Sequence, residues 1–173
     1  MTGRSEDEPA ELSSPACSMS AADDAYMGYA GKAELIAFLN EMLEAERAGS
    51  RVTLRSARAA SAGPVANLLW AIQRDEARWC AMLIRHLKAL GETPSAKVGA
   101  FYDKAMAIPD LPARLAFLNR GQSWVVRKLK ALLPTVRNEA LYAELTAMLS
   151  SHERNIGLVA AELPVSASGR ARL

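Results

Sequence analysis

Four long stretches of this 173-residue chain repeat apolar residues at steps of three and four, the spacing of one face of an α-helix. Gly and Pro residues separate the stretches, so each is predicted to be a helix of its own. The predicted helices run from Lys32 to the turn at 61–64, and over about 64–90, 112–133 and 139–163. Few runs of β-branched residues occur, which favours helix over strand. The sequence therefore predicts a single all-α domain.

The lengths of the connections predict how the four helices are arranged. The first two helices and the last two are each joined by a short turn, so each pair is predicted to form an antiparallel hairpin. The connection at 91–112 has 22 residues and can return the chain along a helix of ~33–45 Å. A short helix is expected within it at about Val98–Ala107. The second and third helices then run parallel, as in a four-helix bundle with a long crossover.

The two ends of the chain differ from this region. Residues 1–31 hold one Arg and six acidic residues, a net charge of −5, and have no sustained periodicity. We expect them to be a disordered acidic N-terminal tail, residues 32–163 to be the bundle, and residues 164–173 to be a loose C-terminal tail.

The rest of the chain carries a net charge of +7, which suits an acidic partner or nucleic acid. No strand, Gly-rich loop or aromatic platform of a nucleic-acid module accompanies that charge, so nucleic acid is not the expected partner. No apolar run reaches the ~18–20 residues of a membrane span, and the N-terminus lacks the features of a signal peptide. Cys17 and Cys80 form no disulfide framework. We expect a cytoplasmic protein without membrane contact.

Four positions on the predicted inward faces are polar: Glu46, Glu76, Gln122 and His152. Buried carboxylates are costly unless they are hydrogen-bonded, paired or metal-bound. In one interpretation, the two glutamates and His152 bind one Fe, Mn or Zn ion, with Glu153 or Gln122 adding an oxygen. In the other, no metal is bound, and water or arginines satisfy the carboxylates. The candidate arginines are Arg47, Arg74, Arg78 and Arg127. Counting residues from the turns does not decide whether the four side chains lie at one level along the bundle axis, as a single layer, or at two levels, as two steps.

Several long segments resemble a known family. FLNEMLEAERAG, RDEARWCAML, FYDKAMAI and FLNRGQSWVVRKLKALLP are similar to a small bacterial ferritin-like family known as a domain of unknown function. The resemblance covers about residues 33–163 and implies a ferritin-like four-helix bundle. The wider superfamily includes rubrerythrins, bacterioferritins and carboxylate-bridged diiron enzymes.

The resemblance also implies a diiron pattern with Glu on the first helix, Glu-x-x-His on the second, Glu on the third and Glu-x-x-His on the fourth. Glu46 and Glu76 match the first two carboxylates. Trp79 stands at the histidine position of the second helix, and the neutral Gln122 stands at the carboxylate position of the third.

The fourth helix matches that pattern in two ways, and neither is complete. If His152 is the histidine, Leu149 replaces the glutamate, and if Glu153 is the glutamate, Ile156 replaces the histidine. At least three of the six ligands are therefore missing. This argues against an ordinary ferroxidase or oxygen-activating diiron enzyme and leaves either a single metal or none.

Three functions are compatible with these observations. The first is a non-enzymatic module with a degenerate diiron site that forms a homodimer or binds a protein partner, through apolar positions such as Trp124 or Phe101 and Tyr102. The second is a metal-binding, small-ligand-binding or redox and stress-related protein that uses Glu46, Glu76 and His152. The third is a basic bundle associated with nucleic acid.

Overall fold

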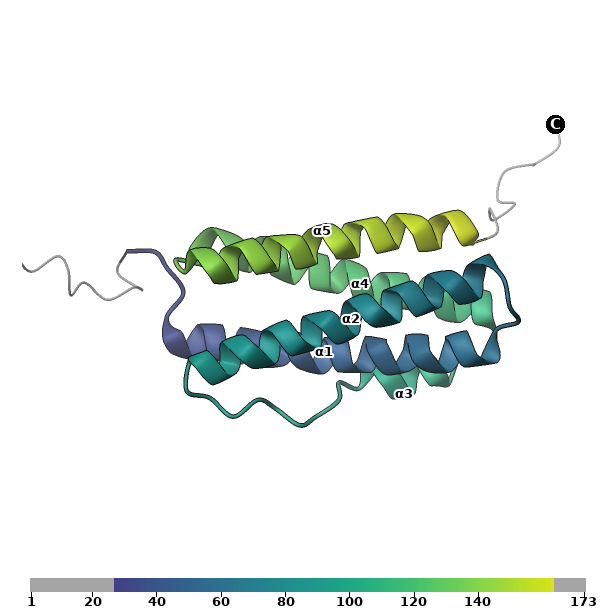
Figure 1. Ribbon diagram of the computed structural model, residues 1–173, viewed down its shortest axis with the longest axis horizontal. Coiled ribbons are helices and arrows are strands. Elements are labelled where there is room, and N and C mark those ends of the chain that lie inside the picture. Colours follow the sequence, from purple (N-terminus) through teal and green to yellow (C-terminus); the bar gives the residue numbers. More distant parts are fainter. Residues whose placement is uncertain (1–26, 164–173) are drawn as a thin grey trace, which may run out of the picture.

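The computed structural model describes residues 27–163 and contains four long helices and two short ones. The helical elements are α1 (Lys32–Ala59), α2 (Pro64–Ala89), α3 (Phe101–Met106), α4 (Leu111–Leu132), the 3-10 turn η2 (Leu133–Thr135) and α5 (Glu139–Glu162). Figure 1 shows α1 and α2 as one antiparallel hairpin and α4 and α5 as the other. The crossover runs beside α1, so α2 and α4 point the same way. The predicted bundle with its long crossover and short helix is confirmed.

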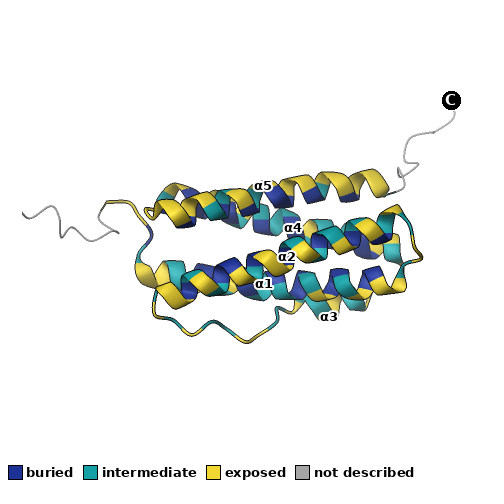
Figure 2. Ribbon diagram, viewed as in Figure 1, coloured by how far each residue is buried: buried dark blue, intermediate teal, exposed yellow. Residues whose placement is uncertain are grey.

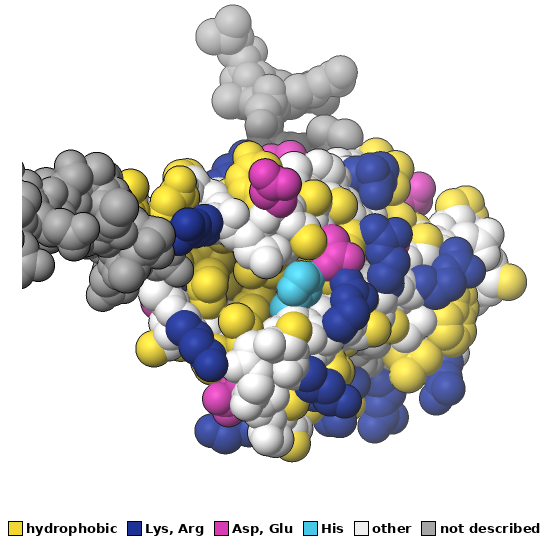
Figure 3. All heavy atoms as spheres, turned by 60° about the vertical axis from the view of Figure 1, so that its left-hand side comes forward, with side chains coloured by type: hydrophobic (Ala, Val, Ile, Leu, Met, Phe, Trp, Pro, Cys, Tyr) yellow, Lys and Arg dark blue, Asp and Glu magenta, His cyan; other side chains and the backbone are white. Residues whose placement is uncertain are grey.

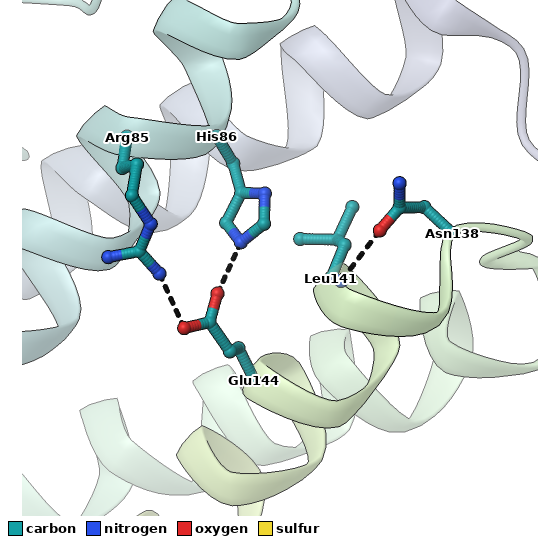
Figure 4. Close-up of polar contacts among 5 residues, drawn as sticks. All are labelled: Arg85, His86, Asn138, Leu141 and Glu144. Atoms are coloured by element: carbon teal, nitrogen blue, oxygen red, sulfur yellow. Dashed lines mark hydrogen bonds and ion pairs between the residues drawn. The ribbon is translucent and has the colours of Figure 1, made fainter.

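Local sequence signals account for where the helices begin and end. The Asp110 side chain accepts a hydrogen bond from the backbone of Ala113 at 2.8 Å, which caps α4. Asn138 caps α5 in the same way through the backbone of Leu141 (Figure 4). After α2, Gly91 takes φ of 77°, a left-handed conformation that a glycine adopts without strain. These signals fix the helix ends to within a few residues of the predicted ones.

The chain just before α1 is attached to the bundle. The backbone N–H of Ala30 donates to the carbonyl of Thr135 at 2.9 Å, and Ala30 itself is buried. This contact attaches the chain just before α1 to the turn between α4 and α5. Residues 1–26 and 164–173 lie outside the described residues, and so do most of the two predicted tails.

The buried residues lie on the inward sides of the helices (Figure 2) and form two apolar clusters. The first cluster contains Leu43, Trp79, Val125 and Met148, and the second contains residues such as Val52, Ile72, Leu118 and Val159. Along each long helix the two clusters are separated by one predicted polar position. The core is thus divided by a single polar layer, and the alternative of two separate steps is not observed.

Within residues 27–163, no helix is long and apolar enough to cross a membrane.

Candidate functional site

The polar layer forms the floor of a cavity of about 520 Å³. Its innermost lining includes Glu46 from α1, Glu76 from α2, Gln122 from α4 and His152 from α5, each no more than 3% exposed. Exposed or half-buried residues of α1, α3 and α4 form the outer lining: Glu41, Glu44, Lys104 and Arg120. The cavity therefore opens between α1 and α4, beside α3, and leads to the centre of the bundle.

Glu46 and His152 form a buried ion pair across the bundle. Nε2 of His152 lies 3.2 Å from Oε1 of Glu46, although the two groups are not aligned as a hydrogen bond. Burial alone would lower the pKa of His152, but the negative charges of Glu46 and Asp75 raise it above its ordinary value. The imidazolium form of His152 is therefore more favourable here than in an unpaired buried histidine, and in that form it offsets the charge of one inward carboxylate.

Glu76 has no cationic neighbour of this kind. Burial, followed by the negative charge of Glu46, raises the pKa of Glu76 well above its ordinary value. Its Oε2 lies 3.1 Å from Oγ1 of Thr53, which also lies 2.9 Å from the carbonyl oxygen of Gly49. The hydrogen bond that Thr53 donates to Glu76 lowers the pKa of Glu76 in part, but burial and the negative charge of Glu46 outweigh it.

Gly49 provides the space that the Glu76 carboxyl occupies. A Cβ at Gly49 would lie 2.5 Å from Oε1 of Glu76. Any other residue at this position would displace the carboxyl from the layer. The absence of a side chain on α1 therefore lets α2 place a carboxyl group beside Glu46.

Several buried polar atoms in the layer have no hydrogen-bond partner among the described residues. They are Oε2 of Glu46, both amide atoms of Gln122, both ring nitrogens of His152 and the indole nitrogen of Trp79; Nε2 of His152 has only its ion-pair contact with Glu46. Such atoms are rare in folded proteins because each costs about 1–3 kcal/mol when left without a partner. Since Glu46, Gln122 and His152 line the cavity, a bound molecule could supply the missing partners.

The arginines expected to neutralise the carboxylates make other contacts. Arg47 donates to the backbone carbonyls of Ser95 and Lys97 in the crossover. The guanidinium of Arg78 lies 4.0 Å from the ring centre of Trp79, while Arg74 and Arg127 are exposed. His152 and Thr53 contact the carboxylates instead.

The side chains of His152 and Glu153 point in different directions from α5, His152 into the core and Glu153 to the surface. The Glu153 side chain is 47% exposed, and its Oε1 lies 2.7 Å from Nζ of Lys130 on the bundle surface. His152 points into the layer, so of the five candidate ligands the structure brings together Glu46, Glu76, Gln122 and His152, and leaves Glu153 outside.

A buried network beside the layer was not predicted from the sequence. Oδ2 of Asp75 accepts hydrogen bonds from Oγ of Ser151 at 2.8 Å and from Nδ2 of Asn155 at 3.2 Å. Asn155 is buried and Ile156 only half-buried, so α5 turns Asn155 rather than Ile156 toward the core. In this orientation Ser151 and Asn155 both reach Asp75 on α2. A polar triplet at positions 151, 152 and 155 is the signal that could have indicated this network.

Cys80 does not contribute a reactive thiol. Burial and the negative charge of Glu46 raise the pKa of the Cys80 thiol to about 12, so the thiolate is strongly disfavoured at neutral pH. Cys80 packs half-buried against the first apolar cluster, as a small hydrophobic residue does.

The donor set does not fit a diiron centre. Where the resemblance implies a histidine, α2 carries Trp79, which offers no metal-binding atom, and where it implies a carboxylate, α4 carries the neutral Gln122. Leu149 and Ile156 are apolar, and Glu153 is on the surface. Across residues 27–163, no group of three or more His, Cys, Asp or Glu side chains is arranged to hold a metal ion.

The surface of the bundle carries scattered positive charge. On the face shown in Figure 3, Lys and Arg side chains are more widespread than Asp and Glu, and apolar and neutral side chains lie between them. Some of this charge is neutralised locally, since Lys128 pairs with Glu41 at 3.0 Å.

The order of the helices, the long crossover and the inward polar layer define a ferritin-like four-helix bundle. In agreement, the chain matches a crystal structure described as "ferritin like, diiron-carboxylate proteins from Bacillus anthracis str. Ames" with a TM-score of 0.68 and 18% identity. The match covers 77% of this chain and 97% of that one. At this identity the similarity establishes the fold alone.

Residues 33–161 match the family described as "Domain of unknown function (DUF6306)", and the chain belongs to this family. The predicted membership of a ferritin-like family of unknown function is thereby confirmed. No curated protein matches the chain.

Proposed function

We propose that this protein is a non-enzymatic ferritin-like module in which a degenerate diiron site has become a binding site for a small organic molecule. The observation that carries the proposal is the cavity of about 520 Å³ that ends on buried polar atoms without partners. Ligand sites in proteins have volumes of about 300–1,000 Å³, with mostly apolar walls and a few polar groups that orient the ligand. The cavity has both properties.

The loss of iron ligands explains how such a site could arise. Trp79 and Gln122 remove a nitrogen and an oxygen ligand, but Glu46, Glu76 and His152 still place polar atoms at the centre of the core. A buried polar layer without a metal requires other partners. A small molecule that enters between α1 and α4 can provide them.

Mass spectrometry of the intact, full-length protein under non-denaturing conditions tests this proposal. We expect an organic adduct that is lost on denaturation and is absent from Ala45→Phe, because Ala45 lines the cavity and a phenyl ring would fill it. Ala37→Phe is the matched control, since Ala37 is exposed on the same helix. No adduct on either the wild type or Ala37→Phe would contradict the proposal.

The same measurement distinguishes a single metal site. An adduct with the mass of one iron, manganese or zinc ion would support the metal-binding alternative, provided that it is lost in the double variant Glu46→Ala/Glu76→Ala. Protein from metal-replete medium without a His-tag avoids a false result. That outcome would replace the organic ligand with a mononuclear metal.

Self-association is a competing proposal with less support. Trp124, Phe101 and Tyr102, which were expected to carry it, are half-buried and pack against the apolar clusters. The large apolar side chains with the greatest exposure are instead Met27, Tyr29, Trp70, Tyr142 and Leu158. Sedimentation analysis of the wild type and a Trp70→Ser/Leu158→Ser variant tests whether these residues mediate a dimer.

A further inference from the structure

We propose that the ligand carries a cationic nitrogen head group, such as an ammonium or amidinium, on a small apolar body, and that the head group binds between Glu46 and Glu76. This inference rests on the proposed ligand-binding function and specifies its chemistry. It depends on three features of the site: its charge balance, the acceptor atoms at its floor and the composition of its walls.

The first feature is an excess of acidic groups over basic ones in the buried layer. In the outer lining, Glu41 and Glu44 are matched in number by Lys104 and Arg120. Glu46 and Glu76 face one imidazole, that of His152, across the layer. The nearby guanidiniums are used elsewhere, since Arg47 donates to crossover carbonyls and Arg114 donates to the carbonyl of Ile108 and to Ser56. The site therefore holds one carboxyl without a cationic partner, and a cationic ligand can supply that partner.

The second feature is the set of free acceptors at the floor of the cavity. Oε2 of Glu46 has no partner, and neither does Oε1 of Gln122. Gly49 lies against Oε1 of Glu76 and blocks that side of the carboxyl group. A ligand can therefore reach Glu76 from the cavity. A head group with two or three N–H donors matches these acceptors. A carboxylate or phosphate has no N–H group to donate to these acceptors and would place a third acidic group in the layer.

The third feature is the apolar wall above the floor. Phe101 stacks on Phe117 with ring centres 4.8 Å apart, and both rings line the cavity together with Trp124. Aromatic walls favour an apolar or aromatic body, and their faces attract a cation that passes over them. The cavity thus matches a molecule that is apolar along most of its length and cationic at the inner end.

Binding of such a ligand has a measurable consequence for protons. When the cation enters, Glu76 gives up its proton to the solvent, and the carboxylate pairs with the head group. About one proton should therefore be released for each ligand bound. A neutral ligand of the same shape would release none.

Isothermal titration calorimetry on the EDTA-treated, full-length protein tests the inference with three probes of equal size. The probes are benzamidine, which is cationic, benzamide, which is neutral, and benzoate, which is anionic. We expect benzamidine to bind at least about tenfold more tightly than benzamide, and benzoate not to bind. Titrations in two buffers with different ionisation enthalpies should give about one proton released per benzamidine.

Two variants distinguish a failure of the cation inference from a failure of the ligand-binding function. Glu76→Gln keeps the shape of the protonated side chain, and we expect it to abolish proton release and the preference for benzamidine. Ala45→Phe should abolish binding of both amidine and amide, whereas Ala37→Phe should not. If benzamide binds as tightly as benzamidine and Ala45→Phe blocks both, the cation inference is wrong and the ligand-binding function stands. Benzamidine binding that ignores Ala45→Phe, or no binding by any probe, would also overturn the inference.

Discussion

The two hairpins meet along two seams that are built differently. Along the α2–α5 seam, Asp75 accepts hydrogen bonds from Ser151 and Asn155. Further along this seam, Glu144 contacts both Arg85 and His86 (Figure 4). Along the α1–α4 seam lies the cavity, and two polar contacts span this seam: the exposed pair of Glu41 and Lys128, and a long hydrogen bond of 3.4 Å from Arg114 to Ser56.

In this small bundle, the α2–α5 seam therefore provides stability, and the α1–α4 seam provides the proposed binding site. The hydrogen bonds of the α2–α5 seam fix α5 in rotation, and this rotation turns His152 toward Glu46. The α1–α4 seam can then stay open without loss of the layer, since its floor is held from the opposite side. A fold that needs four helices to close its core can in this way keep one entrance to it.

The largest expected effect comes from breaking the α2–α5 seam at Asp75. Asp75→Ala leaves Ser151 and Asn155 buried without their acceptor, and we expect a loss of about 2–3 kcal/mol in the free energy of unfolding. Glu41→Ala on the other seam removes an exposed ion pair and should cost no more than about 0.5 kcal/mol. Urea denaturation of both variants measures the difference. Equal losses would mean that the two seams contribute alike.

Two glycines give a second test, in which the larger expected change in the free energy of unfolding is about 1–2 kcal/mol. A Cβ at Gly121 on α4 would lie 2.7 Å from the ring of Phe101, so Gly121→Ala should displace α3 and destabilise the fold by about that amount. Gly157 on α5 has nothing within 4 Å of a Cβ, and Gly157→Ala should instead stabilise the fold by about 0.5–1 kcal/mol through helix propensity. The midpoints of thermal unfolding report both. Stabilisation by Gly121→Ala would show that α3 is not packed as described.

Helical periodicity predicted the faces of the bundle well because burial follows a repeat of 3.6 residues. It identified Glu46, Glu76, Gln122 and His152 as inward positions, and all four are buried. It did not predict that they lie in one layer, because the level of a residue in an antiparallel pair depends on the geometry of the turn.

The partners of the buried groups were harder to predict than the groups themselves. The contact of Thr53 with Glu76 depends on the space left by Gly49, which no periodicity reports. Asp75 lies beside the main inward face of α2, where periodicity does not distinguish a surface position from a contact with the next helix. The cavity depends on the distance between α1 and α4, which no single-sequence pattern reports.

The protonation of Glu76 gives a test that depends on pH. Because the pKa of Glu76 is higher in the folded protein than in the unfolded chain, the folded state holds an extra proton between the two pKa values. Stability should therefore fall as pH rises above about 4.3, by no more than ~1.4 kcal/mol per pH unit from this group. Glu76→Gln removes this slope, so the variant should match the wild type near pH 4 and exceed it at pH 7.

Urea denaturation of both proteins between pH 4 and pH 8 measures this difference. The raised pKa of His152 adds stability that is lost as pH rises through it, but both proteins share this contribution, and it cancels in the comparison. A constant difference across the pH range would show that Glu76 is ionised in the folded protein.

The smallest effect is expected at the exposed end of the α2–α5 seam. The hydrogen bond from His86, and then that from Arg85, lower the pKa of Glu144. The pair with Arg85 is well exposed, with 59% and 39% of the two side chains accessible, so Glu144→Gln should cost at most about 0.5 kcal/mol near pH 6.

A lowered carboxyl pKa adds stability above the unfolded value, and this is lost as pH falls through the folded value. The cost of Glu144→Gln should therefore disappear when urea denaturation is repeated toward pH 3. If Glu144→Gln lowered the free energy of unfolding as much as Asp75→Ala does, the contacts at the exposed end would be the main stabilising contacts of the α2–α5 seam. The buried bonds of Ser151 and Asn155 would then contribute little, and the rotation of α5 that aims His152 at Glu46 would depend on Glu144 instead.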